Sequence, residues 1–251
     1  MKLLKLACLS SLACAVFTAH AAEPLTAEVE LGVIATSGNT ESTSLKGKLK
    51  ITQELENWKN NYQLDTLYKK DEVTVEDDAG NDVTEEQTTA QKLFVSAQGD
   101  YKLNDEHAAL FIYGSYTDDR FSGYDYQSVV AAGYTDQLFT TTNSFLKYDI
   151  GPGYTFNETD DGEKNESAIV RLAAEYQYKL SANAKFSQLL STEAALESSE
   201  NTRTKSETSV SANLMGNLSM KAAYTVIHNS EVPANKEKTD TMTSVTLVYI
   251  F

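Results

Sequence analysis

The chain contains little cysteine and proline, and each scarcity removes a class of protein. Its two cysteines, Cys8 and Cys14, both lie in the first 21 residues, which have the layout of an export signal. The exported chain would then have no cysteine for a disulfide, a thiol nucleophile or a thiolate metal site. The three prolines are Pro24, Pro152 and Pro233, and we expect none of them in the middle of a strand.

Long apolar runs are also missing. Beyond the first 21 residues, no segment approaches the roughly 20 apolar residues that a transmembrane helix requires. Two lysines precede a short apolar run at 6–19, and Ala19 and Ala21 provide the small side chains of a cleavage site. This layout predicts a signal peptide over 1–21 and one domain over 22–251. If that domain crosses a membrane without helices, it must form a closed β-barrel, because backbone polar groups in lipid need internal partners.

Positive charge is scarce too. Lys and Arg number 21 against 36 Asp and Glu, and loss of Lys2 and Lys5 with the signal would leave 19 basic residues. This acidity argues against a nucleic-acid partner. Acidic residues gather at 70–88 and 157–166, where carboxylates are candidate ligands for divalent cations at the outer surface. Neither stretch has EF-hand spacing, and solvated acidic loops are the simpler interpretation. We predict no cofactor and no protein metal site.

What the chain does have is alternation of polar and apolar residues with the period of a β-strand. Twelve such segments can be recognised, each near the roughly 9–11 residues that a tilted strand needs to cross a bilayer. Ten or fourteen strands are also compatible with the pattern. The segments cover 26–36, 43–54, 60–69, 89–101, 107–117, 126–135, 144–154, 167–180, 185–196, 204–214, 218–228 and 239–251.

The connections between these segments alternate in length. Short connections are typical of the periplasmic side of a barrel, and long ones of the outer side. With an even number of strands, both termini of the chain lie on the periplasmic side. The predicted outer loops are 70–88, 118–125, 157–166 and 229–238, and the first outer turn at 37–42 is short.

The final segment is the clearest strand. Over 239–251 the outward face ends in Tyr249 and Phe251, which is typical of the last strand of a bacterial outer-membrane barrel. We predict that these two aromatic residues are the signal for the barrel-assembly machinery. Outer-membrane lipid and lipopolysaccharide are the other expected partners, because the aromatic residues near segment ends suit interfacial girdles.

The second segment, 43–54, indicates which face of the strands points into the lumen. Lys46, Lys48 and Lys50 share one face, and each lysine on the lipid face near the bilayer midplane costs about 2–4 kcal/mol. They must therefore point inward. A hairpin folded at Asn39 would place Glu28 across from Lys50, and Glu30 across from Lys48. Such pairs fix the strand register, because a slip of one residue would turn the lysines into lipid.

The same argument places further charged side chains of both signs inside the barrel. A barrel of this size lies between small filled barrels and wide porins. Ion pairs could fill its interior or line a narrow pore, and the pattern leaves both open. The predicted lumen charges are Glu28, Glu30, Lys46, Lys48, Lys50, Asp65, Lys147, Asp149, Arg171, Glu175, Glu193 and Lys221.

Three local patterns stand out from the alternation. The segments 107–117 and 126–135 alternate poorly, with apolar residues on both faces. Residues 151–153 read Gly-Pro-Gly, and we expect them to end a strand and bend the barrel rim, because proline cannot donate to a ladder. Residues 119–126 carry Arg120 between acids and a glycine suited to a turn, which predicts a tie to the rim or a solute-contacting loop.

An enzyme would need a nucleophile and a base. Beyond the signal the histidines are His107 and His228, which this topology places at opposite ends of the barrel. Ser230 lies two residues after His228, so a membrane phospholipase with a Ser–His pair is an alternative. We predict that the protein is not an enzyme.

Several short stretches together have a family resemblance. Ser-Gly-Asn-Thr occupies 37–40 and Gly-Pro-Gly-Tyr occupies 151–154, and the other stretches are 119–126, 205–209 and 238–251. Taken in chain order, these stretches resemble those of an uncharacterised family described as salt-induced outer membrane proteins and classed as a domain of unknown function. The resemblance implies an outer-membrane barrel and a link to salt or osmotic stress. It brings no substrate and no catalytic residue.

The sequence therefore predicts an all-β fold, an antiparallel transmembrane β-barrel in the bacterial outer membrane. The expected function is that of a structural envelope protein or a narrow pore. The main alternative is a solute- or ion-selective outer-membrane channel. A soluble periplasmic β-barrel binding protein and a membrane phospholipase have less support.

Overall fold

The computed structural model describes residues 24–36, 42–76, 82–103, 107–120, 122–232 and 236–251. The predicted signal peptide lies outside them, as does nearly all of the first outer turn. No helix in this part of the chain is long and apolar enough to cross a membrane.

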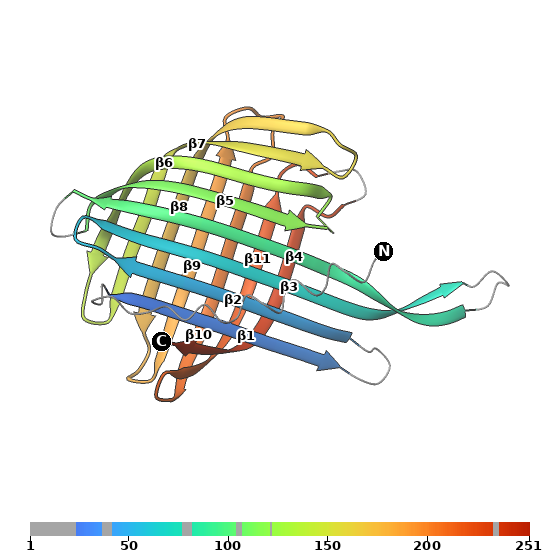
Figure 1. The fold of residues 1–251 in the computed structure, drawn as a ribbon, viewed down its shortest axis with the longest axis horizontal. Coiled ribbons are helices and arrows are strands. Elements are labelled where there is room, and N and C mark those ends of the chain that lie inside the picture. The colour runs from blue at the N-terminus through green and yellow to red at the C-terminus, as the bar shows by residue number, and fades with distance from the viewer. Residues whose placement is uncertain (1–23, 37–41, 77–81, 104–106, 121, 233–235) are drawn as a thin grey trace, which may run out of the picture.

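Twelve strands close into a single antiparallel barrel, as the sequence predicts (Figure 1). Each strand pairs with its neighbours in the chain, and β1 pairs with β12 to complete the ring. The strands are β1 (Leu25–Thr36), β2 (Ser42–Glu54), β3 (Trp58–Glu76), β4 (Asp82–Lys102), β5 (Ala109–Asp119), β6 (Tyr124–Thr140), β7 (Ser144–Thr159), β8 (Lys164–Lys179), β9 (Ala184–Ala195), β10 (Arg203–Met215), β11 (Leu218–Asn229) and β12 (Thr239–Ile250).

Three of the four predicted outer loops are shorter than expected, because the strands continue into them, whereas the loop predicted at 229–238 does separate β11 from β12. β3 and β4 run as a paired hairpin well past the barrel wall, and in register Asp71 faces Gln87 and Val75 faces Val83 (Figure 1). The prediction of a loop over 70–88 was therefore wrong. Among its acidic residues this stretch carries three valines and three threonines, which favour strands.

The Gly-Pro-Gly stretch does not end a strand, because β7 continues through Pro152. The β6–β7 register instead lacks paired residues between Ala131–Gly153 and Tyr134–Ile150, where proline has no N–H to donate. Gly133 and Gly151 approach so closely there that an added Cβ on Gly151 would collide with the neighbouring backbone. The interruption in hydrogen bonding is thus accommodated within the wall rather than at its rim.

The poorly alternating segments are explained by apolar side chains inside the barrel. Ile112 is 65% exposed on the outer face, whereas Phe111 is 1% exposed on the inner face. The sequence pattern is consequently apolar on both sides. The inner apolar cluster comprises Phe111, Tyr113, Val129, Ala131 and Ile169.

The β1–β2 register is the predicted one, with Glu28 across from Lys50 and Glu30 across from Lys48. The seam that closes the barrel is much shorter. β1 and β12 share four residue pairs, against twelve between β1 and β2. With fewer ladder bonds, the seam depends more on side chains.

Candidate functional site

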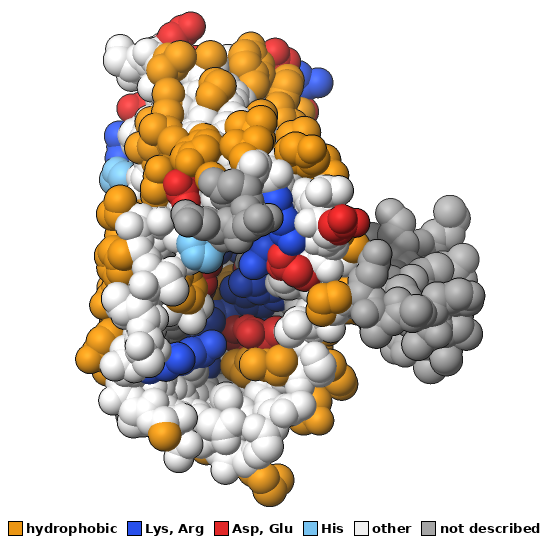
Figure 2. Space-filling model, turned by 90° about the vertical axis from the view of Figure 1, so that its left-hand side faces the viewer, with side chains coloured by type: hydrophobic (Ala, Val, Ile, Leu, Met, Phe, Trp, Pro, Cys, Tyr) orange, Lys and Arg blue, Asp and Glu red, His pale blue; other side chains and the backbone are white. Residues whose placement is uncertain are grey.

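The barrel lumen holds a cavity of about 580 Å³ to which all twelve strands contribute side chains. Its lining extends from Lys50 and Lys185, near the periplasmic turns, to Phe94 and Lys205 further along the barrel. Figure 2 views the molecule from the end where β1 begins and β12 ends, and shows a hollow in which basic and acidic side chains lie. The lumen is therefore neither dry nor completely filled.

The charge of this lining is opposite to the charge of the chain. The whole sequence carries a formal charge of −15, whereas eight basic and four acidic residues line the cavity. Lys205, Lys147 and Lys221 are paired with Asp65, Asp100 and Glu30, which lie just outside this lining. The lining lysines without such a pair can attract anions inside low-dielectric walls. The basic residues are Lys48, Lys50, Lys59, Lys147, Arg171, Lys185, Lys205 and Lys221, and the acidic residues are Glu28, Asp149, Glu175 and Glu207.

Neutral hydrogen-bonding side chains fill much of the remaining wall. Hydroxyls and amides can each donate and accept hydrogen bonds, so the wall can satisfy a hydroxylated solute as well as water. These residues include Asn61, Gln63, Gln98, Gln137, Gln177, Ser187, Ser191, Ser209, Ser211 and Ser219.

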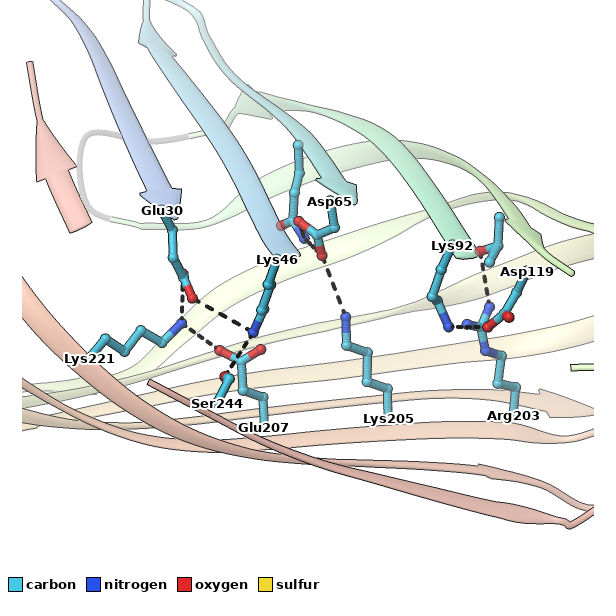
Figure 3. A network of polar contacts seen from close by, with 12 residues as sticks. Glu30, Lys46, Asp65, Lys92, Asp119, Arg203, Lys205, Glu207, Lys221 and Ser244 are labelled. Carbon is cyan, nitrogen blue, oxygen red and sulfur yellow. Dashed lines mark hydrogen bonds and ion pairs between the residues drawn. The ribbon is translucent and has the colours of Figure 1, made fainter. Parts of the chain in front are cut away.

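A fully paired cluster crosses the seam, and we name Glu30, Lys46, Glu207, Lys221 and Thr246 the seam cluster. Glu30 is 0% exposed. Its carboxylate accepts a hydrogen bond from Lys221 Nζ at 3.2 Å and lies 3.7 Å from Lys46 Nζ (Figure 3). It also accepts a hydrogen bond from Thr246 Oγ1 at 2.8 Å. Lys221 also donates to Glu207 at 2.7 Å. Five strands, β1, β2, β10, β11 and β12, are joined through these contacts.

The partners of Glu30 are not those the register suggested. Lys48 lies directly across from it, yet the ion pairs run diagonally to Lys46 and across the seam to Lys221. Strand twist in a closed sheet brings diagonal neighbours within reach of long side chains. No salt bridge joins Lys48 or Lys50 to another described residue, so both ammonium groups line the cavity without a direct ion-pair partner.

A second cluster, on β5 to β8, is incompletely paired, and we name Tyr113, Thr135, Asp149 and Arg171 the Arg171 cluster. Arg171 is 6% exposed. Its guanidinium lies 3.9 Å from the centre of the Tyr113 ring, and Nη1 lies 3.9 Å from Asp149 Oδ2. Arg171 Nε and Nη1, Asp149 Oδ1 and Thr135 Oγ1 are buried without hydrogen-bond partners. Buried polar atoms without a hydrogen-bond partner are rare in folded proteins.

Lys147 borders the Arg171 cluster and balances its acids. Its Nζ lies 3.2 Å from Asp100 and 3.8 Å from Asp149. Gln98 donates to both carboxylates. Asp100, Asp149, Lys147 and Arg171 are thus formally neutral as a group. The positive charge that remains in the cavity comes from other lysines.

Further along the lumen lie contacts that the sequence did not single out. Lys205 reaches Asp65 at 3.9 Å, and Lys92 pairs with Asp119 at 2.8 Å (Figure 3). Arg203 donates to Thr117 at 3.3 Å. The signal was present, because alternation over 203–211 places Arg203, Lys205 and Glu207 on one face, as it does for the lysines of β2.

The structure places the predicted lumen charges on the inner side of the wall. Glu30 and Lys46 belong to the seam cluster, and Asp65 pairs with Lys205. Glu193 is buried opposite Arg171 and Arg203 in the β8–β9–β10 register. The cavity is lined by Glu28, Lys48, Lys50, Lys147, Asp149, Arg171, Glu175 and Lys221.

The two C-terminal aromatic residues lie on the outer surface. Tyr249 and Phe251 are both exposed and their rings contact edge to face, 4.7 Å apart. The backbone N–H of Phe251 donates to Ala27 of β1. Recognition of this pair by assembly machinery stays a prediction.

The acidic stretch at 157–166 is mostly strand with a tight turn. Gly162 adopts φ of 85° there. Asp161 accepts hydrogen bonds from the Thr159 hydroxyl and the Glu163 N–H, which hold the pKa of its carboxyl below the ordinary value. The described residues contain no group of three side chains suited to a metal ion, and divalent-cation binding by the outer loops stays a prediction.

The residues considered for lipase chemistry have other partners. His228 Nδ1 lies 2.8 Å from the Thr239 hydroxyl, and the Ser230 hydroxyl accepts from the Thr202 N–H at 2.8 Å. No hydrogen bond joins His228 to Ser230 in the described chain. The absence of enzyme activity stays a prediction.

Comparison with known proteins agrees with this architecture. The uncharacterised protein YdiY of Escherichia coli (strain K12) is 27% identical over 232 residues, which cover 92% of this chain and 85% of that protein. The NanC porin superimposes with a TM-score of 0.50 at 8% identity, over 90% of this chain and 98% of its own. The COG4313 outer membrane channel from Pseudomonas putida F1 does so with 0.50 at 11% identity, over 95% and 99%.

These structural likenesses concern the fold alone. The sequence match is more specific, because the family described as "Protein of unknown function, DUF481" matches residues 29–251. The chain therefore belongs to that family, and it has the fold of an outer-membrane β-barrel.

Proposed function

We propose that the protein is a narrow outer-membrane channel that prefers small anions. The observation that carries this proposal is the presence of lysines without ion-pair partners, Lys48, Lys50 and Lys185, in the cavity lining of an acidic protein. The outer-membrane location is supported by the apolar outer face, where Leu31, Ile112, Leu172 and Leu247 are exposed on strands around the barrel.

The unneutralised lysines give the proposed pore its preference. Lys48, Lys50 and Lys185 line the cavity and form no salt bridge with the described chain. An entering anion exchanges part of its water shell for these ammonium groups and for the surrounding hydroxyls. Passage requires attraction strong enough for entry and weak enough for release. Flexible, partly hydrated lysines meet this requirement better than a fixed ion pair.

A structural barrel without conduction is the second candidate, and the seam cluster favours it. Glu30 and its partners occupy lumen space with a closed set of contacts that joins five strands. If the whole interior were paired in this way, the side chains would stabilise the wall and block the passage of solutes. The incompletely paired lysines favour the channel instead.

Planar-bilayer recording tests the two candidates. Wild-type protein is expected to give stable ohmic steps in KCl, and the K48Q/K50Q double variant to give a smaller anion current. K69Q/K70Q removes the same charge from the outer part of β3, outside the cavity lining, and is the matched control. A silent wild type, or equal effects of the two double variants, would overturn the channel proposal.

A role in salt or osmotic stress is supported by the family resemblance only. We propose that the amount of the protein rises with external NaCl. Immunoblots of cells grown with and without added NaCl test this, and an unchanged level contradicts it.

A further inference from the structure

We infer that Arg171, Asp149 and Thr135 form a solute site inside the lumen, and that the solute is a small hydroxylated carboxylate. The inference deepens the proposed channel function and rests on it. It names the chemical class of the solute and the place in the barrel where that solute binds.

The first argument is the concentration of unpartnered polar atoms. Five buried side-chain atoms in the described chain have no hydrogen-bond partner, and four of them belong to Thr135, Asp149 and Arg171. These residues are neighbours on consecutive strands, since Thr135 of β6 faces Asp149 of β7 and Arg171 of β8 faces Gly151. The fifth atom, on Thr225, belongs to β11. Unsatisfied buried groups gathered at one place indicate a partner that comes from outside the chain.

The second argument is the chemistry of those atoms. Arg171 Nε and Nη1 are donors that seek an acceptor, and a carboxylate is the acceptor that a guanidinium binds best. Asp149 Oδ1 only accepts, so its partner must supply a donor, and Thr135 can serve either role. A halide satisfies Arg171 alone, and a neutral sugar brings no negative charge. A molecule with a carboxylate and hydroxyls matches both Arg171 and Asp149, the two of these residues that line the cavity, and Thr135 is buried beside Asp149.

The third argument is that the site is rigidly built. The Tyr113 ring lies against one face of the guanidinium and limits its movement. Lys147 lies within 4 Å of Asp149 and keeps the local charge balanced. Gly133 and Gly151, which face Phe111 and Arg171 in register, pack backbone against backbone without room for a Cβ on either, which fixes β6 against β7 beside the site.

The surrounding cavity has the size and polarity for such a solute. Its volume of about 580 Å³ lies within the roughly 300–1,000 Å³ of small-molecule pockets. Arg171 and Asp149 are part of its lining, and serines of β9 and β10 lie elsewhere on the same wall. The excess of basic residues attracts the carboxylate, and the hydroxyl-rich wall replaces the hydration of the rest of the molecule.

Calorimetric titration of the purified protein in detergent micelles tests the site, with sodium gluconate as the probe. Gluconate is expected to bind saturably. Propionate, which has the carboxylate without hydroxyls, and glucose, which has hydroxyls without the carboxylate, are each expected to bind at least tenfold more weakly. Absence of gluconate binding, or equal binding of propionate, would overturn the inference.

Variants identify the residues. R171K keeps the positive charge but loses the planar set of donors, and D149N changes an acceptor into a partial donor. Each is expected to weaken gluconate binding at least tenfold, whereas T225V, which removes the unpartnered hydroxyl on β11, is expected to leave it unchanged. Unaltered binding in both R171K and D149N contradicts the site. Heat-dependent mobility in detergent gels shows whether each variant folds, and T135V replaces any that does not.

Failure of the site and failure of the channel are distinguishable. A protein that conducts anions in bilayers and does not bind gluconate lacks the site and keeps the proposed function. A protein that binds gluconate through Arg171 and conducts nothing has the site and is not a channel.

Discussion

The two charged clusters of the lumen are similar in burial and opposite in pairing. Glu30, 0% exposed, has three partners from β2, β11 and β12. Arg171, 6% exposed, has an aromatic ring and one distant carboxylate, and its Nε and Nη1 have no hydrogen bonds. The seam cluster lies where the barrel closes over four residue pairs. The Arg171 cluster lies away from the seam, on β5 to β8, beside the gap in the β6–β7 register.

This difference indicates two uses for a buried charge. A buried carboxylate with several donors connects the strands that carry those donors, and removing it leaves charges without compensation. A buried guanidinium without acceptors contributes little to the wall, because each unsatisfied buried group costs about 1–3 kcal/mol. The seam cluster therefore stabilises the barrel, and the Arg171 cluster is available to a solute.

The largest expected effect is that of Glu30→Gln. Loss of the carboxylate leaves Lys46 and Lys221 partly uncompensated in a buried place, which lowers the free energy of unfolding by about 3–5 kcal/mol. Urea unfolding in lipid vesicles, followed by the fluorescence of Trp58, the one tryptophan of the chain, measures this. Glu28→Gln on the same strand is the matched control, and an equal loss in both variants would remove the special role of Glu30.

A matched pair of buried threonines sharpens the comparison. Thr246 donates to Glu30, whereas Thr135 is just as buried and has no partner. Thr246→Val is expected to lower the free energy of unfolding by about 1.5–3 kcal/mol, because a hydrogen bond to a charged group is lost. Thr135→Val is expected to be neutral or slightly stabilising. Equal destabilisation by the two substitutions, measured by the same urea titration, contradicts the distinction between the clusters.

A small net effect is expected for Arg171→Met. The substitution forfeits an ion pair at 3.9 Å and a cation–π contact of about 0.5–2 kcal/mol, and it also removes two unsatisfied donors. These contributions oppose each other, so the free energy of unfolding should change by no more than about 1 kcal/mol. A loss as large as that of Glu30→Gln would make Arg171 a structural residue.

The sequence predicted the architecture because lipid imposes a strong rule on each strand. Placing three lysines of β2 inward required only the known cost of charge in a bilayer, and the β1–β2 register followed from pairing Glu28 with Lys50. Strand ends were less predictable. Beyond the membrane no such rule applies, and the hairpin of β3 and β4 continues through residues that charge alone suggested were loop.

The site was less accessible to sequence reasoning. Charges on the inner face could be assigned, but their partners depend on strand tilt and twist, as the diagonal contact of Glu30 with Lys46 shows. The excess of positive charge emerges only once the height of each residue along the barrel is known. Pro152 was expected at a rim because proline lacks the N–H that a strand ladder requires, whereas a local gap in the β6–β7 register accommodates it.

The most direct test of the account is the zero-current potential of the wild-type protein in a planar bilayer across a KCl gradient. The basic lumen predicts a potential of the sign that preferential chloride permeation produces. A potential of the opposite sign would mean that the acidic outer surface, and not the lysines of the cavity, determines what passes, and the account would be contradicted.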